Sequence, residues 1–86
     1  MINLRPEMIT VAGIRRPVPD RFHYSTDGQR LMAGAPEYVL YTNKNGEGLF
    51  FQEHATGNTH QILGTTQFRA ASLDQFKRRL RAWLAD

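Results

Sequence analysis

Two glycine-containing turns divide the second half of this chain into three short runs that favour β-strands. Asn45-Gly46 and Thr56-Gly57-Asn58 supply residues that tolerate a positive φ, which tight hairpin turns require. The pattern predicts a three-stranded antiparallel meander over residues 37–64. The expected strands, which carry aromatic and β-branched residues, span residues 37–43, 48–54 and 59–63.

A capped, amphipathic helix is predicted after the meander, over residues 72–85. Ser72 and Gln75 have the spacing of a capping box, and Asp74 places a negative charge in the first turn. Because a small sheet needs a cover for its apolar face, we expect an apolar stripe of the helix to pack on the meander. That stripe, at helical spacing, consists of Leu73, Phe76, Leu80, Trp83 and Leu84.

The alternation of side chains in Leu49-Phe50-Phe51 places aromatic rings on both faces of the predicted sheet. One face is expected to meet the helix. The other must meet the N-terminal third of the chain or a partner. We expect both faces to belong to the core.

Residues 1–36 are expected to be an irregular part that contains strands. A strand is predicted for residues 8–12, and Asp27-Gly28 predicts a hairpin turn. The prolines in Arg15-Arg16-Pro17-Val18-Pro19-Asp20 exclude a helix and predict an extended basic loop. The strands expected around the hairpin turn are residues 21–25 and 29–32, followed by a loop over residues 33–36.

The chain of 86 residues is expected to form one α+β domain, residues 1–86, with three to six short antiparallel strands and one C-terminal helix. It has no cysteine, which excludes disulfides and thiolate sites and fits a reducing cytoplasm. The apolar runs are too short to span a membrane, and residues 1–5 lack the apolar core of a signal peptide. A net charge of +3 favours nucleic acid or an acidic protein surface as partner.

The residues that carry catalysis or bind metals do not form a recognisable arrangement. His23, Ser25 and Asp27 are close in sequence, but their spacing is typical of a turn and not of a catalytic triad. His54 and His60 are expected to lie near each other across the second hairpin, and a metal site would need a third ligand. We therefore expect no enzyme, no metal and no cofactor.

Basic residues fall into two groups that could contact phosphates. Arg15 and Arg16 belong to the proline-flanked loop, whereas the second group lies on the predicted helix or just before it. The simpler alternative for the second group is a solvated helix face. That group consists of Arg69, Lys77, Arg78, Arg79 and Arg81.

Residues 37–84 resemble the N-terminal arm-binding domain of phage tyrosine integrases, which is a three-stranded sheet packed on a C-terminal helix, as in the plant AP2 domain. The resemblance rests on Tyr38-Val-Leu-Tyr41, Asn45-Gly46, Leu49-Phe-Phe51, Thr56-Gly57, Ile62-Leu-Gly64 and the helix from Ser72. In that family the sheet enters the DNA major groove. The resemblance implies that base or backbone contacts are made by Lys44, Gln52, His54, Asn58 and His60.

Two functions are expected from these observations. The first is a non-enzymatic module that binds double-stranded DNA, of the type found in phages and mobile elements. The alternative is a protein-binding inhibitor or adaptor, such as a phage protein that blocks a host enzyme or defence complex, and a homodimer is a further form of this alternative. Negative charge on Glu47 and Glu53 falls where phosphates would approach the sheet, so the charge of the sheet does not choose between the two.

Overall fold

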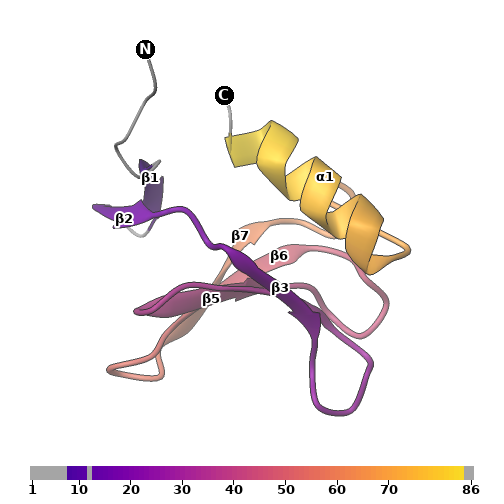
Figure 1. Cartoon of the computed structure of the whole chain (residues 1–86), viewed down its shortest axis with the longest axis horizontal. Coiled ribbons are helices and arrows are strands. Elements are labelled where there is room, and N and C mark those ends of the chain that lie inside the picture. Colours follow the sequence, from indigo (N-terminus) through magenta and orange to yellow (C-terminus); the bar gives the residue numbers. More distant parts are fainter. Residues whose placement is uncertain (1–7, 12, 85–86) are drawn as a thin grey trace.

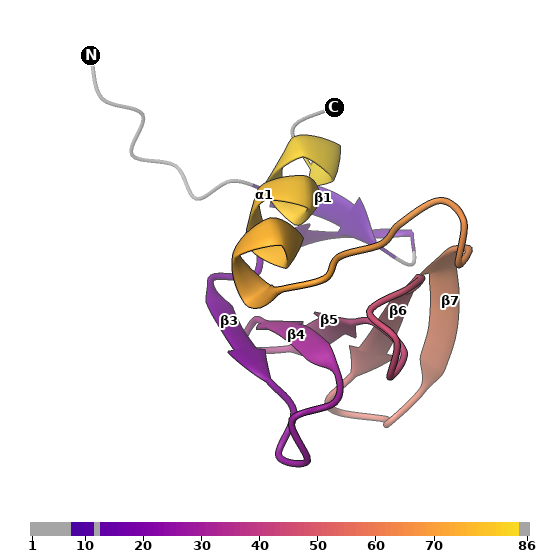
Figure 2. The same cartoon turned by 90° about the vertical axis from the view of Figure 1, so that its right-hand side faces the viewer.

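The computed structural model describes residues 8–11 and 13–84, which form two antiparallel sheets and one helix. The hairpin of β1 and β2 is separate, whereas β3 to β7 form one sheet with its strands in sequence order. The helix α1 covers one face of that sheet, and the hairpin lies on the same side (Figure 1, Figure 2). The predicted α+β class is therefore confirmed. The elements are β1 (Met8–Val11), β2 (Ile14–Pro17), β3 (Arg21–Tyr24), β4 (Leu31–Gly34), β5 (Tyr38–Tyr41), β6 (Leu49–Glu53), β7 (Thr59–Leu63) and α1 (Leu73–Leu84).

The three strands predicted for residues 37–64 are present as β5, β6 and β7. The helix begins where its cap predicts, because the amide of Gln75 donates to the hydroxyl of Ser72 at 3.2 Å. The return bond of the capping box is displaced by one residue. The side-chain oxygen of Gln75 accepts from the amide of Ala71 at 2.7 Å instead of from the amide of Ser72.

The basic loop predicted for residues 15–20 is wrong over its first half. Residues 15–17 belong to β2, whose register pairs Pro17 with Met8 of β1. Proline excludes a helix, but it is compatible with an extended strand at the edge of a sheet. This additional strand raises the total in the described residues to seven, above the six that the sequence predicts at most.

Strand β4 begins two residues later than the strand predicted for residues 29–32, and it takes in half of the loop predicted for residues 33–36. The reason is the length of the preceding turn. The carboxylate of Asp27 accepts hydrogen bonds from the hydroxyl of Ser25 at 2.5 Å and from the amide of Gln29 at 3.0 Å. Gln29 is therefore part of the turn, and strand pairing starts only after it.

The core lies between α1 and the sheet. Phe76 and Leu80 of the apolar stripe are fully buried, and Phe76 makes edge-to-face contacts with Phe22 and Phe68 at centroid distances of 6.2 and 5.8 Å. The predicted packing of the helix on the sheet is therefore confirmed. The sheet contributes the buried side chains of Leu31, Ala33, Tyr38, Leu40, Leu49 and Phe51.

The opposite face of the sheet, which we call the outer sheet face, is partly open to solvent. Its central row runs across all five strands and consists of His23, Met32, Tyr41, Phe50 and Gln61. Met32, Tyr41 and Phe50 are half-buried, and the two ends of the row are exposed. The β1–β2 hairpin lies on the helix side (Figure 1), so this described part of the N-terminal third does not cover the outer sheet face. Among the described residues, the central row is therefore not core, and cover by a partner remains a prediction.

The turn between β5 and β6 holds the segment that leads into α1. The amide of Gly48 donates to the carbonyl of Phe68, and the amide of Ala70 donates to the carbonyl of Gly46, both at 2.8 Å. Gly46 has a φ of 75°, and a Cβ at this position would overlap the carbonyl oxygen of Ala70. Because glycine alone fits there, Gly46 fixes both the turn and the path of residues 68–70. We call these two hydrogen bonds the turn–segment contact.

We expect Gly46→Ala to lower the free energy of unfolding well beyond the cost of about 1–2 kcal/mol for a non-glycine residue at positive φ. The added methyl group also has to displace the Ala70 carbonyl. Gly57→Ala is the matched control, because Gly57 has a φ of 74° and nothing lies within 4 Å of a Cβ built there. Urea denaturation measures both losses. Equal losses would contradict the role assigned to the turn–segment contact.

Candidate nucleic-acid interface

The helix α1 carries four basic residues, of which the three arginines are exposed. Helical spacing assigns the inward stripe to residues such as Phe76 and Leu80, so the cations occupy the remaining circumference. Asp74 is the one carboxylate among the residues of α1. Together with the residue before the helix, the cations form what we call the cationic helix surface: Arg69, Lys77, Arg78, Arg79 and Arg81.

Two of these cations face carboxylates and remain open to solvent. Arg78 Nε lies 3.3 Å from Asp74 Oδ2, and the two side chains are 71% and 82% exposed. Arg69 Nε lies 3.5 Å from Glu47 Oε2, and the arginine side chain is 67% exposed. Exposed pairs of this kind contribute about 0–1 kcal/mol, so a phosphate can replace the carboxylate at little cost.

The other three cations have no carboxylate within 4.0 Å in the part of the chain that the structure describes. Lys77 is half-buried, and its ammonium nitrogen lies over the ring of Phe22 in β3, 5.6 Å from the ring centre. Arg79 and Arg81 are both exposed. This part of α1 therefore carries positive charge that the described residues do not neutralise.

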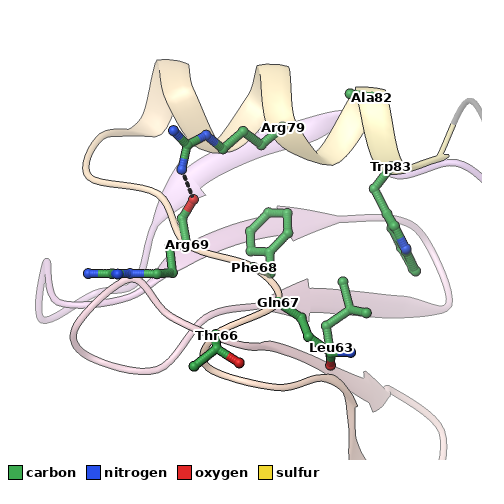
Figure 3. A pocket seen from close by; sticks show the side chains of 8 residues that line it. All are labelled: Leu63, Thr66, Gln67, Phe68, Arg69, Arg79, Ala82 and Trp83. Carbon is green, nitrogen blue, oxygen red and sulfur yellow. Dashed lines mark hydrogen bonds between the residues drawn. The ribbon is translucent and has the colours of Figure 1, made fainter.

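A groove of about 350 Å³ lies beside α1, between the helix and the segment before it (Figure 3). We call it the helix groove. Trp83 extends from α1 toward Leu63 at one end, Arg79 lies at the other end, and Phe68 lies between them. Its lining consists of Leu63, Thr66, Gln67, Phe68, Ala82 and Trp83, together with Arg69 and Arg79.

The two ends of the helix groove are aligned by α1 itself. Arg79 and Trp83 are four residues apart, which places them on the same side of a helix. Arg79 Nη1 donates a hydrogen bond to the backbone carbonyl of Arg69 (Figure 3), and this bond holds the guanidinium at its end of the groove. The groove therefore presents a fixed positive charge and an aromatic ring in one line.

The two arginines predicted to form one basic loop lie in opposite environments. Arg15 is exposed, whereas Arg16 is 2% exposed. The Arg16 guanidinium lies 5.1 Å from the ring centre of Phe51 and 5.7 Å from that of Tyr38, and its Nη1 lies 3.3 Å from Glu53 Oε2. Successive strand residues point to opposite faces, which explains the difference. Arg16 attaches the hairpin to the sheet, and its position does not fit the predicted role in phosphate binding.

Tyr38 completes this attachment. Its hydroxyl donates a hydrogen bond to the carbonyl of Pro17 in β2 at 2.5 Å. Burial raises the pKa of Tyr38 to about 12, although the nearby Arg16 guanidinium acts in the opposite direction. The phenol therefore remains a neutral donor over the whole physiological pH range.

The five residues that the integrase resemblance implies as DNA contacts do not lie together. Lys44 and Asn58 lie in the turns at opposite ends of β6. Gln52 lies on the outer sheet face, while His60 lies on the other face, with its ring centre 5.0 Å from that of Phe51. His54, the fifth of them, follows β6. The entry of this sheet into a major groove remains a prediction.

The two carboxylates expected to oppose phosphates at the sheet, Glu47 and Glu53, both face arginines. Glu53 lies opposite Tyr38 in the register, on the helix side of the sheet, where it meets Arg16. Glu47 lies in the β5–β6 turn, where it meets Arg69. Neither carboxylate therefore belongs to the rows of the outer sheet face.

The two histidines of the second hairpin have separate surroundings. His54 Nδ1 lies 3.2 Å from the carbonyl oxygen of Pro36, whereas His60 packs against Phe51. Within residues 8–11 and 13–84, no group of three or more His, Cys, Asp or Glu side chains is placed to hold a metal ion. In the same residues, no helix has the length and apolar character that a membrane span requires.

The helix groove is the feature that the sequence does not reveal. From the sequence, Trp83 belongs to the apolar stripe, and residues 64–68 carry no functional signal. The sequence signal that could have indicated the groove is the four-residue spacing of Arg79 and Trp83. This spacing places both at the edge of the apolar stripe, where the sheet covers a helical side chain only in part. The opposite wall of the groove comes from a segment whose path depends on the turn–segment contact, which is not local in sequence.

No family model, curated protein or solved structure matches the chain.

Because Arg16 is buried and Arg15 is exposed, we predict that their substitution lowers the free energy of unfolding by different amounts. We expect Arg16→Gln to lower the free energy of unfolding by about 2 kcal/mol, because it leaves Glu53 without its buried partner. Arg15→Gln should change it by less than about 0.5 kcal/mol, as for an ordinary surface site. Urea denaturation compares the variants, and a cost for Arg16→Gln no larger than that for Arg15→Gln would show that the buried cation does not hold the hairpin.

Proposed function

We propose that this chain is a small non-enzymatic nucleic-acid-binding module and that it contacts duplex DNA through the cationic helix surface. The observation that carries the proposal is the charge of α1, which has four basic residues, three of them exposed arginines, and one carboxylate. Duplex DNA carries one negative charge per about 1.7 Å of its axis. A helix of 12 residues is about 18 Å long, so α1 can face several phosphates at once.

The distribution of carboxylates supports this choice of surface. Among the described residues, three of the five cations of the cationic helix surface, Lys77, Arg79 and Arg81, have no carboxylate within 4.0 Å. Phosphate contacts of this kind give affinity without base readout. The proposed module therefore binds the DNA backbone, and the predicted base contacts of Gln52 on the far face of the sheet are not required for affinity.

Salt dependence and a charge-matched control test this proposal. With three or four phosphates neutralised, the slope of log affinity against log salt is expected to be about −3, measured by fluorescence anisotropy of a labelled mixed-sequence duplex. Arg78→Gln with Arg81→Gln should reduce the magnitude of the slope by about 2 and weaken binding at low salt.

The control is the double variant Arg15→Gln with Arg21→Gln, which has the same net charge. Both of its side chains are exposed, and they belong to β2 and β3 and not to α1 or the residue before it, so the variant should keep the wild-type slope. Equal slopes for the two double variants would mean that only net charge matters, and this result would refute the assignment to α1. Absence of binding at low salt would remove the proposed function altogether.

A specific observation favours protein binding as the second candidate, by the outer sheet face. Tyr41 and Phe50 stack at a centroid distance of 5.5 Å, and the guanidinium of Arg30 lies 5.9 Å from the centre of the Tyr41 ring. Because Tyr41 has Phe50 and Arg30 over its ring, little of an aromatic face is left for a nucleic-acid base to stack on. A half-buried apolar row with an arginine and polar ends is typical of a protein contact. This candidate predicts no affinity for duplex DNA at low salt.

A further inference from the structure

We infer that the helix groove accepts one unpaired nucleotide of a nucleic-acid strand, with its base against Trp83 and its phosphate at Arg79. The inference rests on the proposed function, because the strand reaches the groove along the cationic helix surface. It goes further by naming a structural class of partner. Single strands and duplexes with an unpaired base fit the groove, whereas a fully paired duplex leaves it empty.

The size and the lining of the groove favour a single base. Its volume of about 350 Å³ lies at the lower end of the range for small-molecule sites, about 300–1,000 Å³. A base inside a duplex has both faces stacked on neighbouring pairs and can offer neither to a side chain. A base that enters a groove lined by Trp83, Phe68 and Leu63 must therefore be unpaired.

The charged end of the groove favours an anion. Among the described residues, the Arg79 guanidinium donates one hydrogen bond, to the carbonyl of Arg69, and has no carboxylate within 4.0 Å. An arginine has five N–H donors, so several remain for phosphate oxygens. Arg78, its neighbour in sequence, instead faces Asp74 and is not part of the lining.

The segment opposite the helix supplies groups that can hydrogen-bond to the edge of a base. The side-chain oxygen of Gln67 accepts from the amide of Gly64 at 2.6 Å, and this bond fixes the orientation of its amide group. Gln67 and Thr66 both belong to the lining, and their side chains carry an NH₂ group and a hydroxyl group. Aromatic stacking combined with a few hydrogen bonds to base edges is the usual way in which proteins hold unpaired bases.

Intrinsic fluorescence tests this inference directly, because Trp83 is the one tryptophan of the chain. The full chain is titrated at low salt with a short oligodeoxythymidylate and, separately, with a blunt duplex of the same length. We expect the single strand to quench Trp83 and the duplex to bind without comparable quenching. Quenching by both to the same extent would overturn the requirement for an unpaired base.

The outcomes with these two probes, and with two further ones, separate the alternatives. Duplex binding without any quenching by the single strand would overturn the inference and leave the proposed function intact, whereas failure of both probes to bind would remove both. If free thymidine monophosphate quenches Trp83 equally at the same nucleotide concentration, the groove binds a free nucleotide, and the inference that it accepts part of a strand is overturned. If oligoglutamate quenches Trp83 with the same affinity, the groove is a general anion site, and the assignment to a nucleotide is overturned.

Variants test the two ends of the groove separately. Trp83→Leu should weaken binding of a labelled oligodeoxythymidylate between about fivefold and 100-fold, as measured by anisotropy, with unchanged binding of the duplex. Trp83→Phe keeps an aromatic ring and should retain most of the affinity, which guards against a folding defect in the leucine variant. Arg79→Gln should weaken single-strand binding more than Arg78→Gln does, and equal effects would contradict a phosphate at Arg79.

Discussion

The position of α1, and with it the whole cationic surface, depends on the turn–segment contact. Gly46 and Gly48 exchange hydrogen bonds with Ala70 and Phe68, so that the last residues before the helix run alongside the β5–β6 turn. Phe68 is thereby placed against Phe76 in the core, at a centroid distance of 5.8 Å. The same contact sets the wall of the helix groove opposite α1. The β5–β6 turn thus determines the position of the C-terminal helix and of its groove.

The arginines of this protein divide into structural and surface groups according to what lies beneath them. Arg16 is enclosed by Phe51, Tyr38 and a carboxylate, and a buried cation of this kind persists only when it is paired. Arg79 and Arg81 stand on the flanks of an amphipathic helix, where solvent reaches them. Net charge alone does not reveal this division. On α1, three arginines remain exposed, Arg78, Arg79 and Arg81.

The parts of the fold that follow from local chemistry could be predicted from the sequence. The meander follows from glycines at its turns, and the start of α1 follows from the cap that Ser72 provides. The N-terminal strands were harder to predict, because the Asx-type turn around Asp27 extends through Gln29 and because the prolines in and after β2 favour a loop. Within the candidate site, the cations of α1 could be predicted from the sequence. The groove could not, because it joins a helix face to a segment positioned by distant backbone hydrogen bonds.

The two candidate functions use different surfaces: the cationic helix surface and helix groove for nucleic acid, and the outer sheet face for a protein. Because these surfaces lie on opposite sides of the sheet, one experiment can distinguish them. We would label the protein with ¹⁵N and follow its amide resonances during titration with an oligodeoxythymidylate. We predict shifts in α1 and in residues 63–70, with the amides of Met32, Tyr41 and Phe50 unchanged. Shifts concentrated on β3 to β6, with α1 unchanged, would contradict the assignment of nucleic-acid binding to the helix and its groove.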